Sequence, residues 1–384
     1  MPEPGLEFTF GIEEEFFLVD PETRDIIADP DPGIMERCER ESGPHTVVPE
    51  LLRSQVETNT RVCSSIADLR TALAETRRLV VEAAEAYGAR AMAASTHPFA
   101  AWREQQVTPK ARYQEAEIAL QEAVRRFLVG GMHIHAGFGD PDSRLRVMTA
   151  IRRHLPLFIA LSASSPFNDG GFTGFKSYRP IVIGALPRTG LPGPFRSQAE
   201  FDGLVEEYRR IGAIRDSSEL RTDIRPSHAY PTIEIRSCDI CPRMDESMAL
   251  AALYASLLRR LLRQDEGEGL PPEPRTEIIA ENCWLAQRYG TLAFIGDVDG
   301  GGRIDIADCA EALVEEIMED ARALGCEEEL RRIAAILYDG PSADRQLERY
   351  ELCRIEGADH KEALHAVVDE VLEETRTGIG GSAR

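Results

Sequence analysis

The chain has no long apolar run among its 384 residues. None of its hydrophobic stretches approaches the ~20 residues that cross a lipid bilayer. Residues 1–4 also lack the basic and apolar regions of a signal peptide. Both absences argue against a membrane-spanning or exported protein, so we expect a cytoplasmic location.

Lysine is scarce as well, and acidic residues outnumber the basic ones, which are nearly all arginines. The formal net charge is −22, and the only lysines are Lys110, Lys176 and Lys361. Phosphate backbones and anionic membranes attract basic surfaces, so this balance argues against nucleic acid and membrane as partners. So few lysines also leave little scope for Schiff-base chemistry. The excess of acidic residues favours good solubility.

No arrangement of Ser/His/Asp or Cys/His that would suit nucleophilic catalysis stands out. The eight cysteines are scattered. Cys238 and Cys241 form a C-x-x-C pair, but no second pair completes a zinc site. In a reduced chain such cysteines are usually small buried apolar residues. The chemistry is therefore expected to come from other residues.

The hydrophobic pattern predicts strands separated by long helical stretches. The expected strands cover residues 8–19, 54–60, 89–95, 129–138 and 230–237. The expected helices cover residues 65–88, 110–127, 143–162, 200–213, 246–263, 276–289, 307–323, 328–337, 342–352 and 358–375. No glycine-rich βαβ signature is present. We therefore expect an α+β fold: a central, mainly antiparallel sheet with flanking helices and a helical C-terminal part, about residues 276–376.

Residues 163–198 are rich in Gly, Pro, Ser and aromatic residues and have little periodicity. So long a loop is usually functional. Within it, 171–177 approaches a phosphate-binding loop but has Phe175 where glycine must precede the lysine. Residues 297–302 approach the start of a calcium loop but lack its later ligands, so we expect a glycine-rich turn there.

Three of the expected strands carry polar residues at alternating positions. Strand side chains alternate between faces, so Glu13 and Glu15 share one face while Glu14 lies on the other. His133 and His135 share a face of a second strand. A buried face lined with such groups costs several kcal/mol unless the charge is compensated. Divalent cations that hold phosphate oxygens would compensate it.

The third strand adds Thr232, Glu234 and Arg236 on one face, and Arg225 lies shortly before it. Arginine presents a planar fork that suits phosphate or carboxylate oxygens. A surface salt bridge is the simpler interpretation, but a buried Glu-x-Arg strand disfavours it. The strand therefore extends the same candidate site.

Simpler interpretations exist for the other two strands. Glu13 and Glu15 could lie on a solvated face, but the hydrophobic residues around them favour a central strand. A lone histidine on a strand is usually a core residue, whereas His133 and His135 are flanked by glycines, which let a ligand approach closely. Zinc hydrolases also use such a pair, but no clear set of further His or Asp ligands is present.

Further motifs accompany these strand segments, and the full set is spread along the chain: residues 11–15, 55–57, 131–135, 164–166, 225–226, 232–236, Asp239, Asn282, 288–290 and 340–346. Together they resemble the glutamate–cysteine ligase type 2 family, also called the YbdK-like carboxylate–amine ligases. The resemblance extends from about residue 8 to about residue 374. It is specific for the family and much less specific for the substrate.

The resemblance implies one catalytic domain over residues 1–384 with a glutamine synthetase-like fold. It implies ATP as a substrate, with Mg²⁺ or Mn²⁺ held by acidic strands. The implied metal ligands are Glu13, Glu15, Glu50, Glu57, His133 and Glu234, of which Glu50 and Glu57 rest on the resemblance alone. The residues expected to bind the nucleotide are Arg236, Arg225 and Arg179, and the first two are also the candidate catalytic residues. Which of Glu50, Glu57 and His135 contact metal is left open, and relatives suggest a dimer or larger homo-oligomer.

These residues permit carboxylate activation without a protein nucleophile. A carboxylate attacks the γ-phosphoryl group of ATP, and an amine then displaces phosphate from the acyl phosphate to leave an amide. We expect at least weak glutamate–cysteine ligase activity, although the sequence names neither the acid nor the amine. The alternatives are a phosphotransferase of the same superfold, a metal-dependent hydrolase, and a nucleotide-binding regulator without catalysis.

Overall fold

The computed structural model describes residues 7–380, apart from the side chains of Arg112, Ala116 and Arg125. Residues 1–4, which bear on the signal-peptide expectation, lie outside this range. Among the described helices none is both long enough and apolar enough to cross a bilayer.

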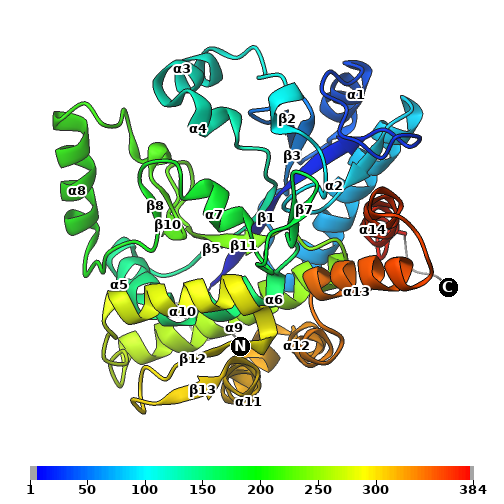
Figure 1. The fold of residues 1–384 in the computed structure, drawn as a ribbon. Helices are drawn as coiled ribbons and strands as arrows, with labels where there is room; N and C mark the ends of the chain where they lie inside the picture. Colours follow the sequence, from blue (N-terminus) through cyan, green and yellow to red (C-terminus); the bar gives the residue numbers. More distant parts are fainter. Residues whose placement is uncertain (1–6, 381–384) are drawn as a thin grey trace.

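A seven-stranded sheet forms the centre of the fold, and its strands pair in antiparallel fashion (Figure 1). Its order is β10 (Ile224–Pro226), β11 (Ile233–Asp239), β5 (Gly131–Gly137), β1 (Thr9–Val19), β3 (Gln55–Asn59) and β2 (Thr46–Pro49), with β4 (Arg90–Met92) also paired to β1. The long strand β1 is central because Ile12, Phe16 and Leu18 are buried on one of its faces. The expected mainly antiparallel α+β fold is confirmed.

Helices cover the face of the sheet that these apolar residues line. α2 (Ile66–Ala86) begins where expected, because the Ser65 side chain accepts a hydrogen bond from the backbone N–H of Asp68. α9 (Met244–Glu266) is almost wholly buried between α2, the sheet and later helices. α6 (Leu155–Ser162) packs against β11.

The other face of the sheet is bordered by shorter segments rather than by a helical layer (Figure 1). They are α3 (Ala111–Leu120), α4 (Glu122–Arg125), α7 (Arg179–Ile183) and α8 (Gln198–Arg210). Two short strand pairs occur in the same part of the chain. They are β6 (Phe167–Asn168) with β7 (Gly171–Phe172), and β8 (Thr189–Gly190) with β9 (Arg221–Thr222). The expected long loop is therefore mostly irregular and lies beside this face.

The C-terminal part is helical, as expected. It contains α10 (Thr276–Tyr289), α11 (Ile306–Leu324), α12 (Glu327–Asp339), α13 (Ser342–Ile355) and α14 (His360–Thr375). The only strands described there are β12 (Phe294–Gly296) and β13 (Arg303–Asp305), which form a hairpin around the predicted glycine-rich turn.

Several segments differ from the sequence-based expectation. The helix expected over 110–127 is divided into α3 and α4 at Gln121, which has a φ of 51°. The helix expected over 143–162 is interrupted, because α5 (Pro141–Ile151) ends in a 3₁₀ turn at Arg152–His154 before α6 begins. Pro156 explains the interruption, since it has no N–H to donate to the carbonyl oxygen of Arg152, four residues earlier, and its ring would clash with that carbonyl. α1 (Gly33–Glu41) and β2 were not expected at all.

Candidate active site

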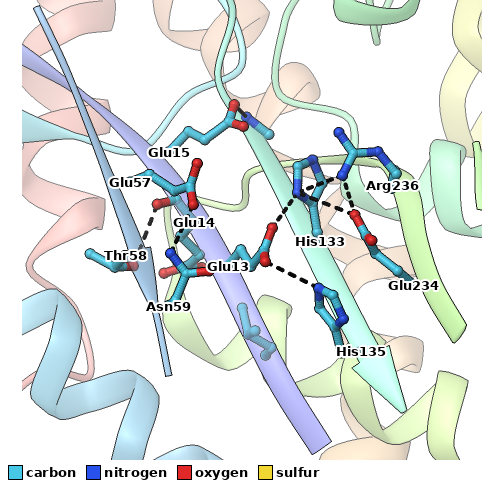
Figure 2. Close-up of polar contacts among 12 residues, drawn as sticks. Glu13, Glu14, Glu15, Glu57, Thr58, Asn59, His133, His135, Glu234 and Arg236 are labelled. Atoms are coloured by element: carbon cyan, nitrogen blue, oxygen red, sulfur yellow. Dashed lines mark hydrogen bonds and ion pairs between the residues drawn. The ribbon is translucent and has the colours of Figure 1, made fainter. Parts of the chain in front are cut away.

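The polar residues of three strands meet on the face of the sheet that the helical layer leaves open (Figure 2). The antiparallel register places Glu13 opposite His133, Glu15 opposite Glu57, and Glu234 opposite His135. Residues directly opposite each other point to the same side of a sheet. The shared faces expected from strand alternation are therefore present.

Glu14 points the other way, into the helical layer. Its carboxylate accepts hydrogen bonds from Arg77 of α2, at 2.7 Å from Nε and also from Nη2, and from Ser247 of α9 at 3.2 Å. The side chains of Glu14 and Arg77 are both fully buried. This pair fixes which face of β1 carries Glu13 and Glu15.

Glu13, His135 and Glu234 form a first group, in which each offers a ligand atom within 4.8 Å of the others. Oε1 of Glu13 lies 3.2 Å from Nε2 of His135, and its Oε2 lies 2.9 Å from Nδ1 of His133. Nδ1 of His133 also lies 3.3 Å from Nη1 of Arg236. His135 thus belongs to this possible ligand group, while His133 lies beside it between Glu13 and Arg236.

Glu15, Glu50 and Glu57 form a second group within the same 4.8 Å limit. The backbone N–H of Gly131 donates to Glu15 Oε2 at 2.7 Å, and the hydroxyl of Tyr113 donates to Glu50 Oε2 at 2.8 Å. Three carboxylates supply the hard oxygen ligands that Mg²⁺ prefers. The two acids that rested on resemblance alone therefore lie beside Glu15.

The second group carries more negative charge than its surroundings neutralise. Burial raises the pKa of Glu15 to about 7 and the pKa of Glu57 to about 8, and the charge of Glu50 adds to the rise at Glu57. A divalent cation among the three carboxylates would offset this repulsion. The donor set therefore fits such an ion.

The negative charge of the first group is offset by neighbouring arginines and by hydrogen bonds with histidines. Burial would raise the pKa of Glu234, but Arg236 and Arg225 outweigh it and bring that pKa to about 2. Burial and Arg236 lower the pKa of His133 to about 4, so its ring is neutral at pH 7. Burial would also raise the pKa of Glu13, but hydrogen bonds with the two histidines hold it well below its usual range.

The three predicted arginines surround these groups. Arg236 forms an ion pair with Glu234, and Nε of Arg225 donates to Glu234 Oε2 at 3.2 Å. Arg179, at the start of α7, is buried and donates from Nη1 to the carbonyl oxygen of Arg236 at 2.9 Å. The structure thus brings every predicted site residue to one region of one sheet face.

A cavity of about 220 Å³ opens beside the second group. Its lining includes Glu15, Glu50, Arg179, Arg221, Asp223, Arg236, Ser237 and Gln287.

Two adjacent residues, Arg236 and Ser237, line it together because a β-bulge lies between Ile235 and Cys238 of β11. Regular alternation would send Ser237 to the opposite face, so the sequence pattern did not identify it. The sequence points to the segment 221–226 for its arginines near a carboxylate, but no pattern assigned Arg221 or Asp223 to the site individually.

Asp239 connects the site to the long loop. Its buried carboxylate accepts hydrogen bonds from the Ser164 N–H at 2.9 Å, the Ser165 hydroxyl at 2.7 Å and the Ser177 hydroxyl at 3.0 Å. The Ser165 oxygen in turn accepts from the backbone N–H of Arg179 at 3.2 Å. The loop thereby positions Arg179 over β11.

The C-x-x-C pair has no place in this arrangement. Cys238 and Cys241 are both buried, and burial raises the pKa of each thiol. Neither belongs to a possible metal-binding group within the described part of the chain. The structure agrees with the expectation of small buried apolar residues.

Two solved structures share this architecture. A bifunctional glutathione synthetase from Pasteurella multocida has a TM-score of 0.66 at 14% identity, over 96% of this chain and 53% of that one. A glutamate–cysteine ligase from Francisella tularensis, solved in complex with AMP, has a TM-score of 0.64 at 14% identity. That match covers 98% of this chain and 90% of the ligase chain. The fold is that of the glutamine synthetase-like ligases.

The chain belongs to glutamate–cysteine ligase family 2, whose model matches residues 9–370. A protein of Rhodospirillum rubrum is 43% identical over all of this chain and 99% of its own length. A protein of Jannaschia sp. is 40% identical over 96% of both chains. Both bear the name "Putative glutamate--cysteine ligase 2". The resemblance seen in the sequence is confirmed at the level of the family.

Proposed function

We propose that this protein is an ATP-dependent carboxylate–amine ligase that forms an amide through an acyl phosphate. The observation that carries the proposal is the convergence of two acidic groups and three arginines on one sheet face. Phosphoryl transfer needs mainly positioning and neutralisation of charge, and these residues can provide both. The family and the names of the relatives support the same activity.

Mg²⁺ is the proposed metal, with Mn²⁺ as a possible substitute. Glu15, Glu50 and Glu57 would hold one ion through carboxylate oxygens alone, which is the donor set that a hard cation prefers. Glu13, His135 and Glu234 would hold a second. Bound there, the ions would offset the negative charge of the phosphates.

The arginines and His133 would bind the phosphates and hold the site residues in position. Arg236 and Arg225 flank Glu234 and present forked donors for the oxygens of the transferred phosphoryl group. Arg179 is held over β11 by the Asp239 network and would bind the nucleotide's phosphates. His133, neutral at pH 7, keeps Glu13 and Arg236 in place.

The substrate acid attacks the γ-phosphoryl group, ADP leaves, and the amine displaces phosphate from the acyl phosphate. We propose at least weak activity with glutamate as the acid and cysteine as the amine, because the relatives bear that name.

We also propose that one domain comprises the whole chain, that it acts in the cytoplasm, and that it forms a homo-oligomer.

A labelled-oxygen experiment tests the mechanism. With ¹⁸O in the substrate carboxylate, one label should appear in the released phosphate, because that oxygen bridges carbon and phosphorus in the acyl phosphate. ADP release should also require both an acid and an amine. Phosphate without label, or phosphate retained covalently on the substrate amine or on the protein, would reject the ligase and favour a phosphotransferase.

A further inference from the structure

The cavity beside the second acidic group contains polar groups that lack partners. The carboxylate of Asp223 makes no hydrogen bond or ion pair within the described part of the chain. The Ser237 hydroxyl and Nε of Arg179 are buried and have no hydrogen-bond partner either, although their residues are only 3% and 4% exposed. Buried polar groups are almost always satisfied, so the Ser237 hydroxyl and Nε of Arg179 point to a ligand. Asp223 is half-buried and lines the same cavity, so its carboxylate is open to that ligand.

Asp223 is the acid in this cavity that the metal groups do not use. The other acidic residues among the described lining are Glu15 and Glu50, and both belong to the second possible ligand group. Arg236 lines the same cavity, and its backbone N–H donates to the Asp223 carbonyl oxygen at 2.7 Å. Asp223 is therefore the lining carboxylate outside the possible metal groups that a ligand of this cavity can reach.

The surroundings of Asp223 are defined by four elements. Charged groups near it are Arg179 at the start of α7, Arg236 of β11 and Arg221 of β9, and the buried thiol of Cys283 on α10 is the neighbouring titratable group. Burial raises the pKa of Asp223 to about 6, although Arg179 and Arg236 oppose the rise. At pH 7 the carboxylate is therefore mostly ionised and able to accept a proton.

The proposed reaction creates a need for such a group. An aliphatic amine arrives as an ammonium ion, and an ammonium ion has no lone pair with which to attack the acyl phosphate. It must lose one proton before the C–N bond forms. Among the described acids that line this cavity, Asp223 is the one outside the possible metal groups that can take that proton.

We propose that Asp223 binds the ammonium group of the amine substrate and accepts its proton. In this step R–NH₃⁺ and the Asp223 carboxylate become R–NH₂ and a carboxylic acid. The free amine then attacks the acyl carbon, the bond from that carbon to the phosphate oxygen breaks, and phosphate departs with its electron pair. The departing phosphate takes up the second proton of the nitrogen, which leaves a neutral amide and hydrogen phosphate. The inference rests on the proposed function and assigns the amine end of that site.

The test compares two amines in the Asp223→Asn variant. With glutamate as the acid and cysteine as the amine, kcat should fall at least ~10²-fold, as is typical of losing a general base. Hydroxylamine is mostly uncharged at neutral pH and needs no such base, so hydroxamate formation should stay within a few fold of wild type. Asp202→Asn, which changes an exposed aspartate of α8, should alter neither rate.

Equal losses with both amines, no loss with cysteine, or a change confined to the KM for glutamate would each overturn the proposal. If Asp223→Asn folds poorly, Asp223→Ala takes its place. Formate added to that variant should restore turnover with cysteine, and failure to restore it would count against the assignment.

Transfer of ¹⁸O to phosphate in the wild-type enzyme separates the two hypotheses. If the wild type shows no transfer, the proposed ligase mechanism fails. If the wild type shows transfer and Asp223→Asn forms acyl phosphate normally but uses cysteine poorly, the result supports both the ligase mechanism and the role of Asp223 as the base for the amine. If Asp223→Asn cannot form acyl phosphate, only the role of Asp223 is rejected.

Discussion

At the scale of single residues, β1 shows how one carboxylate differs from the next. Glu13, Glu14 and Glu15 are consecutive and chemically identical, yet their surroundings give them different tasks. Glu14 is paired with Arg77 in the core, Glu13 lies between two histidines, and Glu15 lies among carboxylates. Alternation along the strand and the elements packed on each face produce this difference.

Replacing the acids on the open face should impair catalysis rather than folding. Glu13→Gln, Glu15→Gln and Glu234→Gln should each lower kcat at least ~10²-fold, because each removes a preorganised electrostatic partner of the reaction. Initial rates measured over a Mg²⁺ titration check this. Glu207→Gln on the exposed side of α8 is the control and should behave as wild type. Near-normal turnover in all three variants would disprove the proposed metal groups.

At the scale of elements, two buried carboxylates hold segments together. Glu14 connects β1 to α2 and α9, and Asp239 connects β11 to the long loop. Neither lines the described cavity beside Glu15. Each nevertheless determines where functional residues lie, since Glu14 orients β1 and Asp239 positions Arg179.

Removing one member of the pair on the covered face should destabilise the fold. Arg77→Met leaves a buried carboxylate without its cation, and such a loss typically costs about 3–5 kcal/mol. The double variant Glu14→Leu with Arg77→Met should cost less than the sum of the two single changes. Urea unfolding of the three variants measures this, and additive losses would mean that the pair is not coupled.

Asp239→Ala should affect stability and activity together. It leaves three donors, on Ser164, Ser165 and Ser177, without their acceptor, which should lower the free energy of unfolding by at least about 2 kcal/mol. Activity should fall further because the loop no longer fixes Arg179. Thermal unfolding and initial rates measure the two effects, with Asp202→Ala as an exposed control. Unchanged activity in a destabilised variant would show that the loop is not needed to position Arg179.

At the scale of the whole molecule, the sheet and the C-terminal helices support each other. The main hydrophobic core combines residues from β1, β5 and β11 with residues from α11 and α12. Farther along the chain, the Gln346 side chain of α13 donates to the carbonyl oxygen of Ser164 at 3.0 Å. The C-terminal part therefore contacts the loop that carries Arg179.

We predict that the full chain unfolds in a single transition. A shared core leaves no boundary at which the C-terminal helices could separate, and two-state behaviour follows when one core stabilises both parts. Calorimetry should give equal calorimetric and van't Hoff enthalpies, and a chain ending at residue 275 should not fold. Two separated transitions would instead indicate independent domains.

The sequence by itself determined the local features of this protein. Alternation assigned Glu13, Glu15, His133, His135, Glu234 and Arg236 to their faces, and periodicity located most strands and helices, because both depend only on neighbouring residues. The resemblance to the family added Glu50 and Glu57, which no local pattern would have revealed.

Only the tertiary structure decided how these pieces meet. Strand register placed His135 opposite Glu234, so that these two residues and Glu13 form a possible ligand group. A bulge turned Ser237 into the cavity, and pairing of β10 with β11 brought Asp223 beside it. Register, bulges and cavities arise from contacts between residues far apart in the chain, and a one-dimensional pattern contains no information on which distant residues touch.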